Sequence, residues 1–178
     1  TYVRDARSII PGISGTLSWN PLSCMYFRTA SATECQYTEW LLAIIAQSAP
    51  FKPNMSTIAT TIKADRGLLP DYFELMEKAG LIAQLHDSTK GVRGLGKVEK
   101  VYLDNTNLSF ALTSETPDIG NQRETFFFNQ MRVNHTVYNS PISDFLIDGK
   151  TFEIGGKKKG QKQITEAEEG YIVKDDIE

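Results

Sequence analysis

Two carboxylates flank a tight-turn signal near the end of the chain, in SDFLIDGKTFEIGG. Asp148 and Gly149 form a dipeptide typical of two-residue hairpin loops, because both positions tolerate positive φ. A hairpin closed by this turn places Asp144 directly opposite Glu153, with β-carbons ~4.5–5.5 Å apart, where like charges repel each other. A divalent cation such as Mg²⁺ or Mn²⁺ between the two acids would remove that repulsion. The alternative is a solvated surface hairpin on which the repulsion is tolerated.

A third acid precedes the hairpin on a strongly apolar segment. GNQRETFFFNQM predicts a helix over residues 121–132, in which Glu124 is close to three consecutive phenylalanines. An acid on so apolar a helix lies either at the rim of the buried face or in a site. These residues alone leave both possibilities open, and Glu124 is a candidate third carboxylate ligand beside Asp144 and Glu153.

The elements that must position these acids form two units. In the first unit, residues 37–112, apolar spacing predicts helices at 37–48, 55–62 and 68–76, then strands at 81–85 and 97–105. Two short helices joined by a tight turn and followed by a hairpin make a winged helix-turn-helix module.

A polar linker, residues 113–120, leads to the second unit, which extends to residue 178 and is expected to be incomplete at its C-terminal end. Its predicted elements are the helix at 121–132, a strand near 136–138, the Asp-Gly hairpin and a last strand at 171–173. The fold class is thus α+β.

The charge distribution limits what the first unit can bind. The formal net charge of −3 gives the chain no general attraction for nucleic acid or anionic membrane. Basic residues gather at the expected wing and after the Asp-Gly hairpin: Lys90, Arg93, Lys97, Lys100, Lys158, Lys159 and Lys162. The second helix of the winged helix is acidic, with Asp71, Glu74 and Glu77. We expect contact with the DNA backbone rather than base reading in the groove, and a purely structural role for the helix pair is the alternative.

Other features exclude several classes of site. GVRGLGKV, residues 91–98, matches most of the phosphate-binding loop, but Val98 replaces its hydroxyl residue and a strand follows it, so we expect no nucleotide to bind this chain. Cys24 and Cys35 have no metal-binding spacing and are expected to be free thiols.

The sequence contains no secretory signal and no apolar run long enough for a spanning helix. We therefore expect a cytoplasmic protein without membrane contact.

The order of these segments resembles the C-terminal region of prokaryotic AAA-type ATPases, in which an ATPase module is followed by a winged helix and a PD-(D/E)XK nuclease-like domain. In the first unit the resemblance rests on PFKPNMSTIATTIKADRGLLPDYFELMEKAGLI and KVYLDNTNLSFAL. In the second it rests on IGNQRETFFFNQM, SDFLIDGKTFEIGGKKKGQKQI and YIVKDDIE. It covers residues 37–178 and implies that residues 1–36 connect to an absent ATPase module, a partner within the same chain.

The resemblance also implies roles for the site residues. By position, Glu124 corresponds to the family's helix acid, Asp144 to its hairpin aspartate and Glu153 to its second acid. The family motif has a lysine two residues further on, where this chain has Gly155, and Lys157 is the expected replacement if the strand stays regular. The family's motif lysine activates water and stabilises developing negative charge. Because this chain lacks it at position 155, the sequence does not decide whether the site cleaves DNA. The alternative is a non-enzymatic protein-interaction or scaffold module with no metal and no DNA cleavage.

Overall fold

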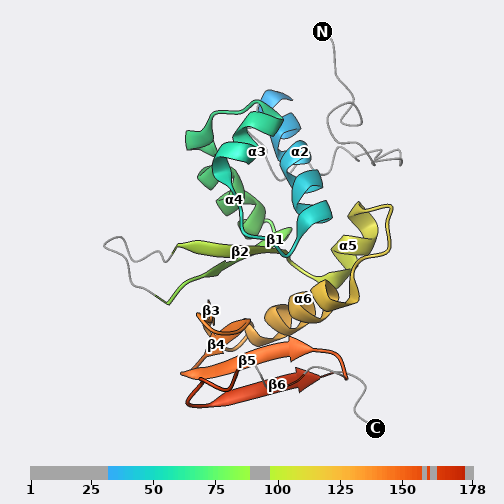
Figure 1. Ribbon diagram of the computed structural model, residues 1–178. Coiled ribbons are helices and arrows are strands. Elements are labelled where there is room, and N and C mark those ends of the chain that lie inside the picture. The colour runs from blue at the N-terminus through green and yellow to red at the C-terminus, as the bar shows by residue number, and fades with distance from the viewer. Residues whose placement is uncertain (1–31, 89–96, 158–159, 161–163, 175–178) are drawn as a thin grey trace.

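The computed structural model of this chain is a mixed α+β structure, as the sequence predicts. It describes residues 32–88, 97–157, 160 and 164–174 (Figure 1). Within these residues the α-helices are α2 (Ala32–Ser48), α3 (Met55–Ile62), α4 (Leu69–Lys78), α5 (Thr106–Leu112) and α6 (Ile119–Met131). One sheet contains the strands β1 (Ile82–His86), β2 (Val98–Leu103), β3 (Val137–Asn139), β4 (Phe145–Ile147), β5 (Lys150–Gly155) and β6 (Gly170–Lys174). No helix in the described ranges is long and apolar enough to cross a membrane.

Helices α2, α3 and α4 form a layer over the β1–β2 hairpin (Figure 1). Their apolar spacing predicts this layer, although α2 begins at Ala32 rather than at Tyr37. The side chain of Asn54 caps α3 by accepting a hydrogen bond from the Thr57 N–H at 3.1 Å. Gly80 follows the end of α4 with a φ of 68°, the left-handed conformation that glycine adopts most easily. Local signals thus place these helices correctly.

The β1–β2 hairpin is shared by two hydrophobic cores, because its side chains alternate between the faces of the sheet. On one face, Ile82, Val101 and Leu103 pack in a first core with α2, α3 and α4. On the other face, Ala83, Leu85 and Tyr102 pack in a second core. That second core also contains Phe128 of α6 and Phe145, Ile147 and Ile154 of the C-terminal strands. The hairpin therefore belongs structurally to both predicted units.

The strand order also joins the two predicted units. The strands follow one another as β2-β1-β3-β4-β5-β6. Strand β1 meets β3 in parallel through His86 and Tyr138, and β5 runs parallel to β6. The remaining neighbours are antiparallel. A single sheet thus passes from the hairpin of the first unit into the second.

The predicted Asp-Gly hairpin is confirmed with its register. Asp148 and Gly149 have φ values of 51° and 80°, as a two-residue turn with positive φ at both positions requires. Strands β4 and β5 pair Ile147 with Lys150, and Phe145 with Phe152. Phe145 is fully buried in the second core, and Phe152 packs against that core. The face of the hairpin that carries Phe145 and Phe152 is therefore its core side.

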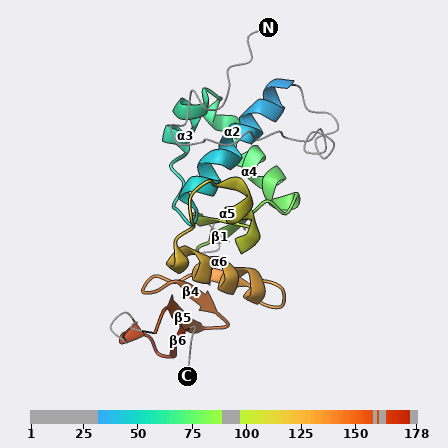
Figure 2. The ribbon, with the colours of Figure 1, turned by 90° about the vertical axis from the view of Figure 1, so that its right-hand side faces the viewer.

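Helix α6 is fixed to the first unit along its length. The Gln122 side chain donates to the Ser109 hydroxyl of α5 at 2.6 Å. Further along, the Asn129 amide donates to the backbone carbonyl of Asp104 at 2.7 Å, and Arg132 forms an ion pair with the Asp104 carboxylate. Figure 2 shows α5 and α6 between the helical layer and strands β4–β6. Helix α5 itself is not predicted from the sequence, because seven residues are too short to show a clear period.

Candidate functional site

The three predicted acids come from α6 and the β4–β5 hairpin. Glu124 is on α6, Asp144 immediately precedes β4, and Glu153 is in β5. The charges of both Glu124 and Glu153 raise the pKa of Asp144. The three predicted acids are thus close enough for the charges of Glu124 and Glu153 to act on Asp144.

Lys100 of β2 also reaches this site. Its Nζ atom lies 3.1 Å from Oε2 of Glu124 and 3.7 Å from Oδ1 of Asp144. All three side chains are largely shielded from solvent, with 30%, 20% and 16% of their areas exposed for the lysine, glutamate and aspartate. The hydroxyl of Tyr102, two residues further along the same strand, donates to the same Glu124 oxygen at 3.2 Å. The first unit therefore supplies a cation and a hydroxyl donor to the acids of the second.

The hairpin acids are buried and hydrogen-bonded. The Ile154 N–H donates to Oδ2 of Asp144 at 2.8 Å. Glu153 is 1% exposed and accepts a hydrogen bond from the Ser143 hydroxyl. Phe152 and Ile154 pack at the second core, so Glu153, which lies between them in β5, is on the opposite side of the strand. The alternative of a solvated acidic face is therefore wrong.

Burial controls the ionisation of two groups in the site. It raises the pKa of Asp144 above its ordinary value, and the charges of Glu124 and Glu153 raise it further. The Ile154 N–H and the Lys100 ammonium group act in the opposite direction and lower this pKa, but they do not cancel the rise. Burial also raises the pKa of Tyr102, with Glu124 as a second cause. The tyrosine hydroxyl consequently stays protonated and donates a hydrogen bond to Glu124.

The raised pKa of Asp144 predicts a pH-dependent effect of Asp144→Asn. A carboxyl whose folded-state pKa is raised stabilises the fold below its ordinary pKa of about 4, and this contribution is lost as the pH rises through the raised value. Asparagine does not titrate, and its side-chain oxygen can still accept from Ile154. We expect the unfolding free energy of the variant, relative to wild type, to increase between acidic and neutral pH.

Urea unfolding at a series of pH values measures this effect. Glu115→Gln, which neutralises an exposed acid, is the control for the change in net charge. A difference between Asp144→Asn and wild type that stays constant from pH 4 to 8 would contradict the burial of an ionised Asp144.

The three acids have partners within the protein itself. In the part of the chain that the structure describes, no group of three His, Cys, Asp or Glu side chains could hold a metal ion. Oxygens of Glu124 and Asp144 face the Lys100 ammonium group, and Glu153 accepts from Ser143. Lys100 therefore already supplies a cation to Glu124 and Asp144, two of the three acids that the sequence predicts as ligands of Mg²⁺ or Mn²⁺.

Lys157 does not take the place of the missing motif lysine in this arrangement. Strand β5 ends at Gly155, so the alternation that would direct Lys157 toward the acids stops before it. Lys157 lies exposed in the following turn, where its carbonyl accepts a hydrogen bond from Lys174. A β-carbon at Gly156 would lie 3.1 Å from Nη1 of Arg123, so this glycine leaves space for a guanidinium group from α6. The sequence predicts neither Arg123 nor Ser143 as a neighbour of the site.

The predicted nucleic-acid contacts are described only in part. Lys90, Arg93, Lys158, Lys159 and Lys162 lie outside the described residues. Lys97 is described; its side chain is 68% exposed and its Nζ lies 3.3 Å from the Glu99 carboxylate. The assignment of Lys100 to the basic wing surface is wrong, because strand alternation turns it with Tyr102 toward the second core.

The helix expected to enter a DNA groove has an acidic exposed side. On α4, Asp71 is exposed and Glu74 pairs with Lys78. Glu77 accepts hydrogen bonds from the backbone N–H and the side-chain amide of Gln84, at 2.7 and 2.8 Å. Its carboxylate therefore fixes α4 to β1. These contacts give the helix a structural role, and its charge does not favour phosphate binding.

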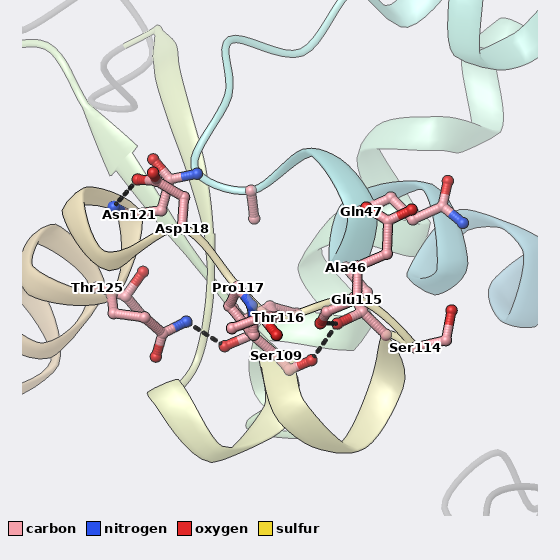
Figure 3. Close-up of a pocket in the computed structure, with 14 residues that line it drawn as sticks. Ala46, Gln47, Ser109, Ser114, Glu115, Thr116, Pro117, Asp118, Asn121 and Thr125 are labelled. Atoms are coloured by element: carbon pink, nitrogen blue, oxygen red, sulfur yellow. Dashed lines mark hydrogen bonds between the residues drawn. The ribbon is translucent and has the colours of Figure 1, made fainter. Parts of the chain in front are cut away.

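A cleft of ≈ 430 Å³ lies where the end of α2 meets α5, the segment 113–118 and the start of α6 (Figure 3). The polar groups that line the cleft form hydrogen bonds mainly with one another. Gln122 donates to Ser109, Asp118 accepts from the Asn121 N–H at 2.9 Å, and the Thr113 hydroxyl donates to the carbonyls of Ser109 and Glu115. None of its described lining residues is a His, Cys, Lys or Arg. The cleft shares no residue with the acidic site and offers no paired acid and base.

The comparisons with known proteins identify no relative. No family model, curated protein or solved structure matches this chain.

Proposed function

We propose that this chain is the winged-helix and nuclease-like region of an AAA-family ATPase, and that its nuclease-like unit does not cleave nucleic acid. The observation that carries the proposal is the position of Lys100, 3.1 Å from Glu124 and 3.7 Å from Asp144. A lysine ammonium group that faces two carboxylates compensates part of their charge and so weakens their attraction for a catalytic cation. Gly155 at the motif position and the exposed Lys157 support the same conclusion.

The order of elements supports both parts of this assignment. Helices α3 and α4, joined by a 3₁₀ turn at Arg66–Leu68 and followed by β1 and β2, have the sequence of elements of a winged helix. An acid on α6 and two acids on the following hairpin have the order of a nuclease-like site. The acidic α4 does not favour a helix in the DNA groove, so we assign contact with the nucleic-acid backbone, in the cytoplasm, to the basic wing.

A second candidate function is protein docking through α6. Ile119, Phe126 and Val133 are all exposed, and their spacing of seven residues places them on one side of the helix and its end. Exposed apolar side chains in a row are typical of protein-contact surfaces. This stripe favours the non-enzymatic scaffold alternative if nucleic acid does not bind.

The test of the proposal measures DNA binding and DNA cleavage on the same samples. We expect no cleavage of supercoiled or branched DNA with either Mg²⁺ or Mn²⁺. We expect weak, salt-sensitive binding, and Lys90→Ala/Arg93→Ala should reduce the slope of log affinity against log salt by about 2, because each phosphate contact contributes about 0.9. Fluorescence anisotropy with labelled DNA at several salt concentrations gives this slope.

Lys150→Ala/Lys174→Ala removes the same charge from the β5–β6 side of the molecule and is the matched control. The proposal of a non-cleaving unit fails if wild type produces cleavage that Glu153→Ala abolishes. If wild type does not bind DNA even at low salt, the nucleic-acid role fails and the docking function remains.

A further inference from the structure

Lys100, the cation in the acidic site, comes from the edge strand β2, which is not a neighbour of β4 or β5 in the sheet. Lys100 is on β2, at one edge of the sheet, whereas Glu124 is on α6 and Asp144 precedes β4. The second core explains how they meet, because Tyr102 of β2 packs with its ring centre 4.9 Å from Phe128 and 6.0 Å from Phe145. This packing holds β2 against α6 and β4.

Three features hold the Lys100 side chain in the site. Its backbone is fixed by the pairing of Leu85 with Lys100 in the β1–β2 hairpin. Alternation along β2 places it on the same face as Tyr102, which is completely buried. The Tyr102 hydroxyl and the Lys100 amine both reach Oε2 of Glu124. The lysine is therefore directed at the acids by the strand and the core and does not lie there as a free surface side chain.

We propose that the ammonium group of Lys100 takes the place of a divalent cation between Glu124 and Asp144, and that this lysine keeps the site free of metal. The inference rests on the proposed function, which identifies the acids as a degenerate cation site. A divalent ion needs the same carboxylate oxygens at about 2.0–2.2 Å, and it would lie within a few ångströms of a like-charged amine. Metal and Lys100 consequently exclude each other.

Removing the lysine charge is expected to create a metal site. Without Lys100, Glu124 and Asp144 would be two neighbouring carboxylates, with the charge of Glu153 also acting on Asp144. Two carboxylates completed by water are sufficient to hold Mg²⁺ or Mn²⁺. The same change removes a link between the β1–β2 hairpin and the second unit, so metal should restore part of the stability that is lost.

The experiment is calorimetric titration of wild type and Lys100→Met with Mn²⁺, together with thermal unfolding with and without Mn²⁺. We expect wild type to show no saturable uptake, and Lys100→Met to bind at least about tenfold more tightly. We also expect Mn²⁺ to raise the melting temperature of the variant but not of wild type. Lys97→Met, which removes an exposed lysine paired with Glu99, and Lys100→Arg, which keeps the charge, should both behave as wild type.

Each outcome decides between the alternatives. If wild type and Lys100→Met bind Mn²⁺ equally, the exclusion by Lys100 is wrong and the acids form an ordinary metal site, whereas the proposed loss of cleavage is decided separately by the DNA cleavage assay. If neither binds, Lys100 does not replace a metal, while the proposed non-cleaving function remains valid. If Lys100→Met is unfolded without metal, recovery of its helical circular-dichroism signal on addition of Mn²⁺ supports the proposal, and no recovery overturns it.

Discussion

Tyr102→Ala is expected to reduce the free energy of unfolding by about 3–5 kcal/mol, as is typical for removing a buried aromatic ring. Tyr102 is completely buried and packs against Phe128 of α6 and Phe145 of β4. It therefore connects the β1–β2 hairpin to the second core, and its loss leaves a cavity between the two predicted units. Its hydroxyl also donates to Glu124, so the substitution removes a donor from the acidic site.

Tyr102→Phe is the matched control for this prediction, because it keeps the ring and removes only the hydroxyl. We expect it to cost about 1 kcal/mol, the usual contribution of one hydrogen bond. Urea unfolding followed by circular dichroism gives both values. A loss below about 1 kcal/mol for Tyr102→Ala would contradict the packing of the hairpin on the second core.

Lys100→Met in the absence of metal is expected to cost about 2 kcal/mol of unfolding free energy. The substitution leaves Glu124 and Asp144 as neighbouring, largely shielded carboxylates without their counter-charge. Breaking a fully buried ion pair costs more, about 3–5 kcal/mol, but these side chains are partly exposed and water screens part of the effect.

Lys97→Met provides the comparison for the stability of Lys100→Met. Lys97 is on the same hairpin and pairs with Glu99, but its side chain is mostly exposed. We expect its substitution to change the unfolding free energy by no more than about 0.5 kcal/mol. Equal effects at the two lysines would mean that the Lys100 contacts contribute no more than an ordinary surface pair.

The features predicted correctly from the sequence depend on short-range signals. The Asp-Gly turn determines the register of β4 and β5 by itself, because few other residue pairs adopt positive φ at both positions. Helices α3 and α4 have clear apolar spacing, and Gly80 ends α4. The grouping of Asp144 and Glu153 could be predicted because it depends on this register alone.

The features that were missed depend on contacts between distant segments. The pairing of His86 with Tyr138 joins β1 to β3, and a single residue pair leaves no recognisable pattern in the sequence. The position of Lys100 follows from which face of β2 packs on α6, and both faces of that strand are partly apolar. Charge counting assigned this lysine to the wing because lysines are usually exposed. Only the second core shows that it points inward.

The most direct test of the central claim is a double-mutant cycle between Lys100 and Glu124, with Lys100→Met and Glu124→Gln made singly and together. If the lysine neutralises this acid, removing the acid should relieve part of the cost of removing the lysine. We expect the unfolding free energies to show a coupling of about 1–2 kcal/mol between the two positions, within the range found for contacting charged residues. Additive effects, with a coupling below about 0.3 kcal/mol, would contradict the claim that Lys100 is the cation of the acidic site.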